Sequence, residues 1–146
     1  MGSIIVRKAA EADLDAIYEI ERLSFKDPYP PGYLQTLRSL NPQTFYIAER
    51  GGTPVGYIVT TADRDRGHIL AIAVHPAERR KHVGKCLIAK SLTDLRDRGV
   101  KTVRLEVRRS NVEAQRFYED LGFQYAYTIE AYYDDEDGLV YYAPLP

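Results

Sequence analysis

Hydrophobic residues recur along the chain with two different periods, one typical of strands and one typical of helices. Strands are indicated by short apolar runs or by apolar residues at every second position, and helices by apolar residues three and four positions apart. By these patterns the chain has about seven strands and four helices. The predicted strands are Ile4–Arg7, Thr44–Glu49, Pro54–Ala62, His68–Val74, Lys101–Arg108, Phe123–Tyr133 and Leu139–Tyr142. The predicted helices run from Leu14 to before Pro28, from Tyr33 to Leu40, from 83 to 98, and from the capping box Ser110-x-x-Glu113 to Gly122.

The order of these elements predicts an α/β fold built on a mixed central sheet. Gly51-Gly52 joins two predicted strands as a hairpin, and the last two strands form another. The helix at 83–98 connects two strands, and a right-handed crossover of this kind makes them parallel. At 146 residues, the chain is expected to be a single domain that covers residues 1–146.

Composition and charge narrow the function classes. The net charge is −1, so bulk electrostatics predicts no nucleic-acid partner. The single cysteine, Cys86, excludes an intrachain disulfide and suits a reducing compartment. No apolar run reaches the roughly 18 residues of a membrane span and no leader precedes the first strand, so we expect a soluble, cytoplasmic protein without a membrane partner.

The junction between the fourth strand and the third helix has the pattern of an anion-binding loop. The strand ends at Val74-His75-Pro76, and the basic segment Arg79-Arg-Lys-His-Val-Gly84 leads into the helix. A helix that starts near Val83 leaves about four N–H groups without intrahelical acceptors and carries roughly half a positive charge at that end. A phosphate is therefore the expected ligand.

Two common phosphate loops do not fit this segment. A nucleoside-triphosphate loop requires a glycine where the chain has Arg79, and a Ser or Thr where it has Cys86. A dinucleotide fingerprint requires three spaced glycines, and the segment has only Gly84.

The pattern that remains resembles the acyl-CoA pyrophosphate loop of the GCN5-related N-acetyltransferases, or GNAT family. That loop reads Arg/Gln-x-x-Gly-x-Gly/Ala, and this chain has Arg79-x-x-His82-x-Gly84. His82 replaces the first glycine, which would cost about 1–2 kcal/mol if its φ must be positive and little if φ is negative. We expect cofactor binding to survive this replacement, with His82 able to donate to a phosphate oxygen.

A second segment resembles the RimI-type N-terminal protein acetyltransferases of the same family. Residues 103–111 include Leu-Glu-Val-Arg-Arg-Ser-Asn, and residues 118–123 read Tyr-Glu-Asp-Leu-Gly-Phe. The resemblance implies the GNAT acyl-CoA N-acyltransferase fold and transfer of acetyl from acetyl-CoA to the α-amine of a protein or peptide N-terminus, without a metal. Ribosomal proteins are among the candidate partners, and the oligomeric state is not implied.

The resemblance also implies roles for individual residues. Glu106 would be the general base and Tyr118 the acid that protonates the coenzyme A thiolate. The cofactor would be held by Ile72, Ala73, Val74, Arg79, Arg80, Lys81, His82, Val83, Gly84, Lys85, Asn111 and Tyr118. The peptide would be bound by tyrosines that lie where the family builds its substrate slot, namely Tyr29, Tyr33, Tyr132 and Tyr133.

Structural alternatives remain open for these residues. Glu106 could lie on a solvated strand face between two arginines, Tyr118 could be a core residue, and Asn111 could only assist the Ser110 cap. The run Asp134–Asp137 could attract a peptide ammonium or be a solvated turn. The three histidines are spaced by seven, but a strand and Pro76 prevent them from sharing a helix, so no metal site is expected.

Two other functions also remain open. The same fold could acetylate a lysine or a small amine. A non-catalytic module that senses acyl-CoA or binds a partner is the alternative of another class, and the His82 replacement is the sequence feature that favours it.

Overall fold

The structure is a computed structural model that describes residues 3–146. It divides into two compact units, of which the first comprises Met1–Thr61 and Ile69–Asp94 and the second comprises Ala62–His68 and Leu95–Pro146. The expectation of a single domain over residues 1–146 therefore stays a prediction. Among residues 3–146, no helix has the length and hydrophobicity needed to cross a bilayer.

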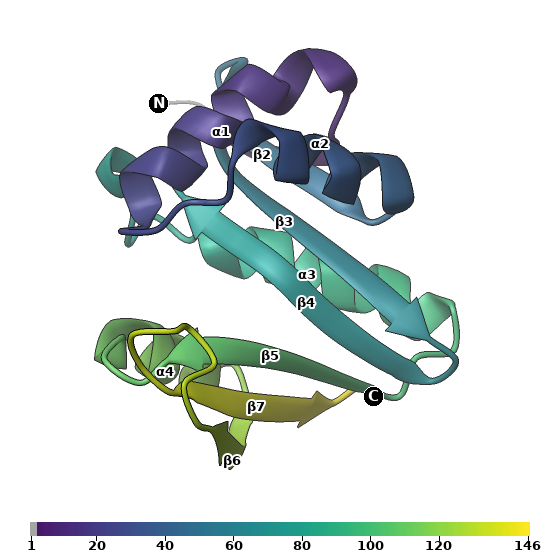
Figure 1. Cartoon of the computed structure of the whole chain (residues 1–146). Helices are drawn as coiled ribbons and strands as arrows, with labels where there is room; N and C mark the ends of the chain where they lie inside the picture. The colour runs from purple at the N-terminus through teal and green to yellow at the C-terminus, as the bar shows by residue number, and fades with distance from the viewer. Residues whose placement is uncertain (1–2) are drawn as a thin grey trace. The chain divides into compact units, whose positions relative to one another are not determined.

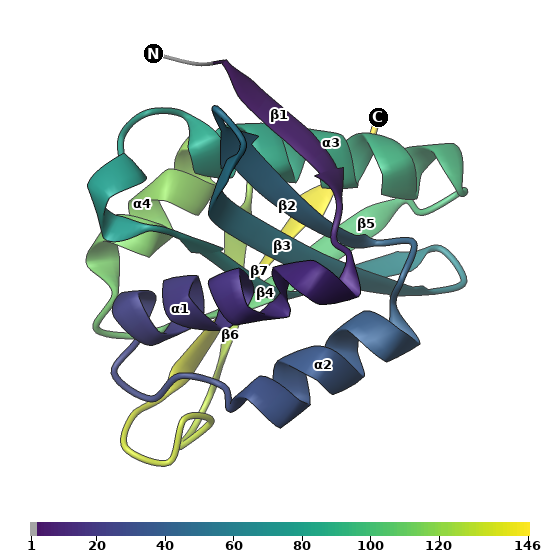
Figure 2. The same cartoon turned by 90° about the horizontal axis from the view of Figure 1, so that it is seen from above.

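The first unit is built from antiparallel strands with helices on both faces. Its elements are β1 (Ile4–Lys8), the short 3-10 helix η1 (Glu11–Asp13), α1 (Leu14–Ser24), α2 (Pro31–Leu40), β2 (Phe45–Arg50), most of β3 (Thr53–Asp63), the C-terminal part of β4 (Arg66–Val74), the 3-10 helix η2 (Pro76–Glu78) and most of α3 (Val83–Asp97). Figures 1 and 2 show α1 and α2 on one side of β2 and β3 and α3 on the other.

Successive side chains of β2 and β3 point to opposite faces of the sheet, and each face packs against different helices. Phe45 and Tyr57 stack with ring centroids 5.6 Å apart in the cluster that α1 and α2 cover, together with Ile17 and Leu34. Gly56 points to the opposite face, where a Cβ would come within 3.1 Å of Leu87 on α3. Burying each large apolar side chain of this core contributes about 1.5–3 kcal/mol to folding.

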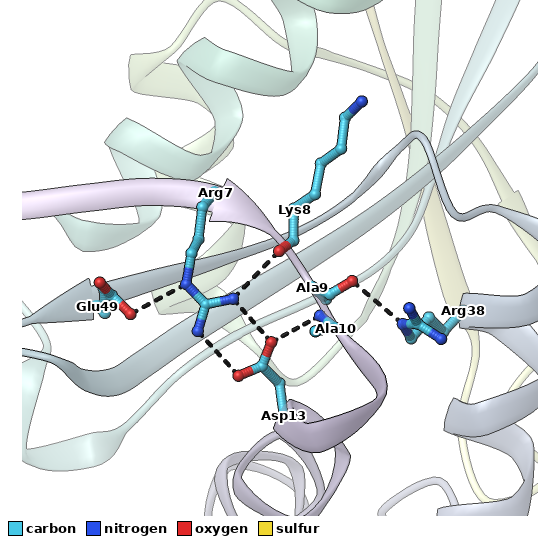
Figure 3. A network of polar contacts seen from close by, with 7 residues as sticks. All are labelled: Arg7, Lys8, Ala9, Ala10, Asp13, Arg38 and Glu49. Atoms are coloured by element: carbon cyan, nitrogen blue, oxygen red, sulfur yellow. Dashed lines mark hydrogen bonds and ion pairs between the residues drawn. The ribbon is translucent and has the colours of Figure 1, made fainter.

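A polar network fixes the start of α1 (Figure 3). The Arg7 guanidinium donates two hydrogen bonds to Asp13, at 2.8 and 2.9 Å, and a third to Glu49 at 3.1 Å. Asp13 also accepts from the Ala10 N–H at 2.6 Å, and Arg38 donates to the Ala9 carbonyl at 3.1 Å. The Arg7 guanidinium holds the pKa of Asp13 below its usual value. The network joins β1, β2 and both helices.

The second unit consists of β5 (Thr102–Arg108), α4 (Val112–Asp120), β6 (Gln124–Ile129) and β7 (Gly138–Pro144), with the N-terminal part of β4. β4 pairs parallel to β5 at residues 66–68, and β7 pairs antiparallel with both β5 and β6. The seven strands form one sheet in the order β1-β2-β3-β4-β5-β7-β6. With the four α-helices of residues 3–146, this confirms the predicted mixed α/β fold.

Most boundaries differ from the sequence prediction by a few residues, and three differences lie near the predicted site residues. α2 begins at Pro31 rather than Tyr33, because proline is favoured in the first turn of a helix. β6 ends at Ile129 rather than Tyr133, and Ala131 and Asp134 in the following turn have positive φ values of 53° and 64°. The cap of α4 is Asn111, whose side chain accepts the Ala114 N–H, and not the predicted Ser110.

Candidate active site

The basic loop before α3 has a left-handed backbone at two positions. Arg80 has φ 62° and His82 has φ 66°. Of the two cases that the sequence leaves open for His82, the structure therefore has the positive φ, which costs a non-glycine residue about 1–2 kcal/mol. The His82 carbonyl accepts the Cys86 N–H at 3.0 Å, so α3 starts directly after it. The first N–H groups of α3 are left to face a ligand.

The side chains of this loop are partly held by the protein itself. Arg79 Nε donates to the Val74 carbonyl at 3.3 Å, and Ser24 Oγ donates to the same oxygen at 3.3 Å. Lys81 lies 3.8 Å from Glu78, which also pairs with Arg50 at 2.9 Å. These contacts tie the loop to the end of β4.

The predicted peptide residues of the first unit form an aromatic pair. The rings of Tyr29 and Tyr33 lie 4.7 Å apart at an angle of 53°. Their exposed fractions are 38% and 43%, which is high for tyrosine and leaves both rings open to a ligand. They come from the connection between α1 and α2 and from the first turn of α2.

Glu106 is the centre of a side-chain network in the second unit. Its side chain on β5 is 10% exposed, so the alternative of a solvated strand face is wrong. His68 Nε2 lies 2.7 Å from Glu106 Oε1, and the Tyr132 hydroxyl donates to the same oxygen at 3.3 Å. Arg104 Nε lies 3.5 Å from the other carboxylate oxygen. The parallel register explains the arrangement, because His68 is the strand partner of Arg104, two residues before Glu106.

Tyr118 is both a packed residue and a potential proton donor. It is 8% exposed, and its ring lies in edge contacts with Phe117 at 5.4 Å and Phe123 at 5.9 Å. Burial raises the pKa of the phenol, which therefore stays protonated at neutral pH. No other group of residues 3–146 hydrogen-bonds to its hydroxyl.

The connection between β6 and β7 is fastened to the end of β5. Arg108 donates to Asp135 at 2.8 Å and to Glu136 at 3.1 Å, and its guanidinium lies over the Tyr133 ring at 4.5 Å. Arg109 pairs with Asp137 at 3.4 Å. The interpretation of a solvated turn fits Asp134 and Asp135, which are exposed, while arginines pair with Asp135, Glu136 and Asp137.

The same connection explains why Ser110 does not cap α4. Both the N–H and the hydroxyl of Ser110 donate to Glu136, at 3.1 and 2.9 Å. These bonds and the pairing with Arg108 hold the pKa of Glu136 below its usual value. The adjacent Asn111 then supplies the cap, while Tyr132 packs so closely on Gly138 that a Cβ there would lie 2.9 Å from its ring. Gly138 thereby lets the Tyr132 hydroxyl reach Glu106.

Residues 14–123 match the sequence model of the family described as Acetyltransferase (GNAT) family. The chain belongs to this family. The match covers the anion loop, Glu106 and Tyr118, and it confirms the resemblance drawn from the two motifs.

Several relatives of this GNAT acetyltransferase are named for their activity. It is 31% identical over 154 residues to an N-alpha-acetyltransferase of Sulfurisphaera tokodaii, with 96% of this chain and 92% of the relative covered. It is 32% identical over 126 residues to the [ribosomal protein bS18]-alanine N-acetyltransferase of Escherichia coli, with 86% and 84% covered. Among solved structures, Ard1 from Thermoplasma volcanium superposes with a TM-score of 0.94 at 30% identity, with 98% of each chain covered.

His68 lies beside Glu106 in the candidate site, and the sequence prediction did not include it. The histidine was considered only as a metal ligand, and among residues 3–146 no group of three potential ligands could hold a metal. Arg104 donates to His68 Nδ1 at 3.2 Å, so Nδ1 acts as the acceptor and Nε2 carries the hydrogen that points to Glu106. The signal was present in the sequence as a histidine and a glutamate on strands predicted to be parallel.

Proposed function

We propose that this acetyltransferase transfers acetyl from acetyl-CoA to the N-terminal α-amine of proteins or peptides, by direct attack in a ternary complex. The observation that carries the proposal is the nearly buried Glu106, which His68 and Tyr132 hold from two sides. The names of the two relatives, both N-terminal acetyltransferases, support the α-amine as the acceptor.

Glu106 is proposed as the general base. With pKa values of about 8 for an α-amine and 10.4 for a lysine, freeing the neutral amine at pH 7 costs roughly 1.4 and 4.6 kcal/mol. A carboxylate that acts through one water is sufficient for the first of these. The His68 imidazole fixes the orientation of the carboxylate through Oε1, and the water is proposed to bind Oε2, which Arg104 approaches to 3.5 Å.

The proposed reaction balances with one base and one acid. The amine nitrogen forms a bond to the acetyl carbonyl carbon, and the carbon–sulfur bond to coenzyme A breaks. The amine loses a proton to Glu106 through water, and the departing thiolate takes a proton from the Tyr118 hydroxyl. Solvent then removes the proton from Glu106 and reprotonates Tyr118. Because the amine attacks acetyl-CoA directly, no covalent enzyme intermediate forms.

Acetyl-CoA is proposed to bind at the start of α3. The N–H groups of Val83, Gly84 and Lys85 and the side chains of Arg79, Arg80, Lys81 and His82 offer donors and positive charge to the pyrophosphate. Gly84 has no Cβ, so the backbone can approach the phosphates. The β4 residues Ile72, Ala73 and Val74 and the α4 residues Asn111 and Tyr118 are proposed for the rest of the cofactor.

Two pairs of tyrosines are proposed as contacts of the acceptor peptide. The rings of Tyr29 and Tyr33 have centroids 4.7 Å apart, and those of Tyr132 and Tyr133 have centroids 4.9 Å apart. Tyrosines present apolar rings to a side chain and hydroxyls to a peptide backbone. Because the Escherichia coli relative is named for a ribosomal protein, ribosomal N-termini are the first candidates for the acceptor.

The proposal is tested by mass spectrometry of a peptide panel incubated with acetyl-CoA. The panel contains peptides with free N-termini, including those of ribosomal proteins, and matched peptides with blocked N-termini and free lysines. A gain of one acetyl group confined to free N-termini is expected. Acetylation of the blocked peptides would move the acceptor to lysine, and polyamine acetylation would move it to small amines. Acetyl-CoA binding without any product would contradict an enzymatic function.

A further inference from the structure

Glu21 is a buried acidic residue that the proposed reaction does not use. It lies on α1 and is only 2% exposed. Burying a carboxylate is unfavourable unless hydrogen bonds replace its hydration, so a side chain of this kind needs a structural or functional reason. Among the residues the structure describes, no cation forms an ion pair with Glu21.

Its two oxygens connect three parts of the first unit. The Tyr57 hydroxyl on β3 donates to Glu21 Oε1, and the Tyr29 N–H donates to Oε2 at 2.9 Å. Glu21 thus links α1 and the core of the sheet to the backbone of Tyr29. Burial raises the pKa of Glu21, while both hydrogen bonds oppose that rise because they favour the ionised form.

The sequence around Tyr29 gives the segment few backbone donors. Pro28, Pro30 and Pro31 have no N–H group, so Tyr29 is the only residue from 28 to 31 that can donate from its backbone. The prolines also restrict φ along the segment, which limits the alternative conformations. Glu21 accepts this one N–H, directly beside the Tyr29 ring that lies 4.7 Å from Tyr33.

We propose that Glu21 is a positioning residue for substrate: it holds the Tyr29–Tyr33 pair in the orientation that binds the acceptor peptide. This inference rests on the proposed function, in which that pair contacts the peptide. Glu21 acts through Tyr29 and does not touch the reacting atoms. Loss of the attachment raises the KM for the peptide and leaves kcat and acetyl-CoA affinity nearly unchanged.

The variants Glu21→Leu and Glu21→Gln separate positioning from simple packing. Leucine fills similar space and removes both acceptors. Glutamine keeps both contacts, because its Oε1 can accept the Tyr29 N–H while its Nε2 donates to the Tyr57 oxygen. Glu19→Leu is the matched control, since Glu19 lies on the same helix with a side chain that is 51% exposed and paired with Arg22.

Two measurements are made on each full-length variant. Steady-state kinetics with a peptide that the native chain acetylates should give a KM about tenfold higher for Glu21→Leu and within about threefold of native for Glu21→Gln. Hydrogen–deuterium exchange of the Tyr29 amide should be about tenfold or more faster in Glu21→Leu than in Glu21→Gln or Glu19→Leu.

The outcomes distinguish this inference from the proposed function. If the native chain acetylates no free N-terminus, the proposed function fails, and the Tyr29 amide exchange still tests the attachment. Unchanged exchange in Glu21→Leu would overturn the inference whatever the chain acetylates, as would a native KM. If Glu21→Leu does not fold, Tyr57→Phe removes one of the two partners, and a KM rise of about threefold is then expected. A native KM in Tyr57→Phe would overturn the inference.

Discussion

Glu21 and Glu106 are two nearly buried carboxylates that accept a hydrogen bond from a tyrosine, but their remaining partners differ. Glu21 binds the backbone N–H of a connecting segment. Glu106 binds the side chain of a histidine on the neighbouring strand. The first arrangement fixes a segment of chain, and the second fixes the carboxylate itself against other side chains. Burial alone therefore does not tell these two acids apart, whereas the identity of the second partner does.

The largest expected effect is the loss of kcat when Glu106 becomes neutral. We expect Glu106→Gln to lower kcat at least about tenfold, because the amide cannot accept the amine proton, while Glu21→Gln keeps kcat within about threefold. Acetyl-CoA affinity, measured by calorimetry, should match the native chain in both. Near-native turnover of Glu106→Gln with intact affinity would remove the general-base role.

The next effect separates two buried phenols, Tyr118 and Tyr57. Tyr57 has Glu21 as its partner, so Tyr57→Phe should lower the free energy of unfolding by about 1 kcal/mol in urea titration and leave kcat in place. Tyr118→Phe keeps the ring packing, so its stability should be native, while kcat falls about tenfold because the thiolate loses its acid. An unchanged kcat in Tyr118→Phe would make this tyrosine structural.

A smaller effect is expected for the orienting histidine. His68→Phe removes the Nε2–H donor, and kcat should fall about fivefold because Glu106 loses its fixed orientation. His68→Gln keeps an N–H donor and should recover part of that loss. The comparison is made from initial rates at saturating substrate. Equal rates in His68→Phe and the native chain would show that Glu106 needs no orienting partner.

The smallest effect concerns how the free energy of unfolding depends on pH. Asp13 and Glu21 are expected to change it in opposite directions. Arg7 lowers the pKa of Asp13, so its contribution is present above the unfolded pKa of about 3.9 and is lost as pH falls through the lower folded value. Burial raises the pKa of Glu21, so its ionised form is unfavourable and stability falls as pH rises through that value.

Urea titrations across pH test these signs. Asp13→Asn should lose most relative to the native chain near pH 7, and the difference should shrink below about pH 4. Glu21→Gln should be more destabilised at low pH than near pH 7, where it should be as stable as the native chain or slightly more stable. Its difference from the native chain therefore shrinks as pH rises, whereas that of Asp13→Asn grows. Parallel curves for the two variants would contradict the assigned pKa directions.

The fold was predictable because its elements follow from local pattern. The strands and helices were found to within a few residues, since alternation and helical spacing are read from neighbouring side chains. The differences lie where the local structure depends on residues that are distant in the sequence. Ser110 has a good capping sequence, but Glu136 takes its hydroxyl and Asn111 becomes the cap. The acidic run lies in an exposed turn, as its composition indicated, but its pairing with Arg108 and Arg109 joins residues that are far apart in the sequence.

Sequence motifs predicted only those residues of the candidate site that belong to the motifs themselves. Glu106 and Tyr118 were identified because their residues match family patterns, and their roles remain proposals. His68 and Glu21 lie outside those patterns. Their importance depends on register and burial, namely the pairing of His68 with Arg104 and the insertion of Glu21 under Tyr29. A sequence without coordinates does not give either relation.

The position of β7 between β5 and β6 has a consequence for how the fold assembles. All seven residues of β5 pair with β7, although α4 and β6 lie between these two strands in the chain. Tyr132 and Gly138, which together place a hydroxyl on Glu106, also follow that helix and strand. The contacts around Glu106 are therefore long-range contacts, which require a large loop to close before they form. We expect them to form late in folding, after the local helices.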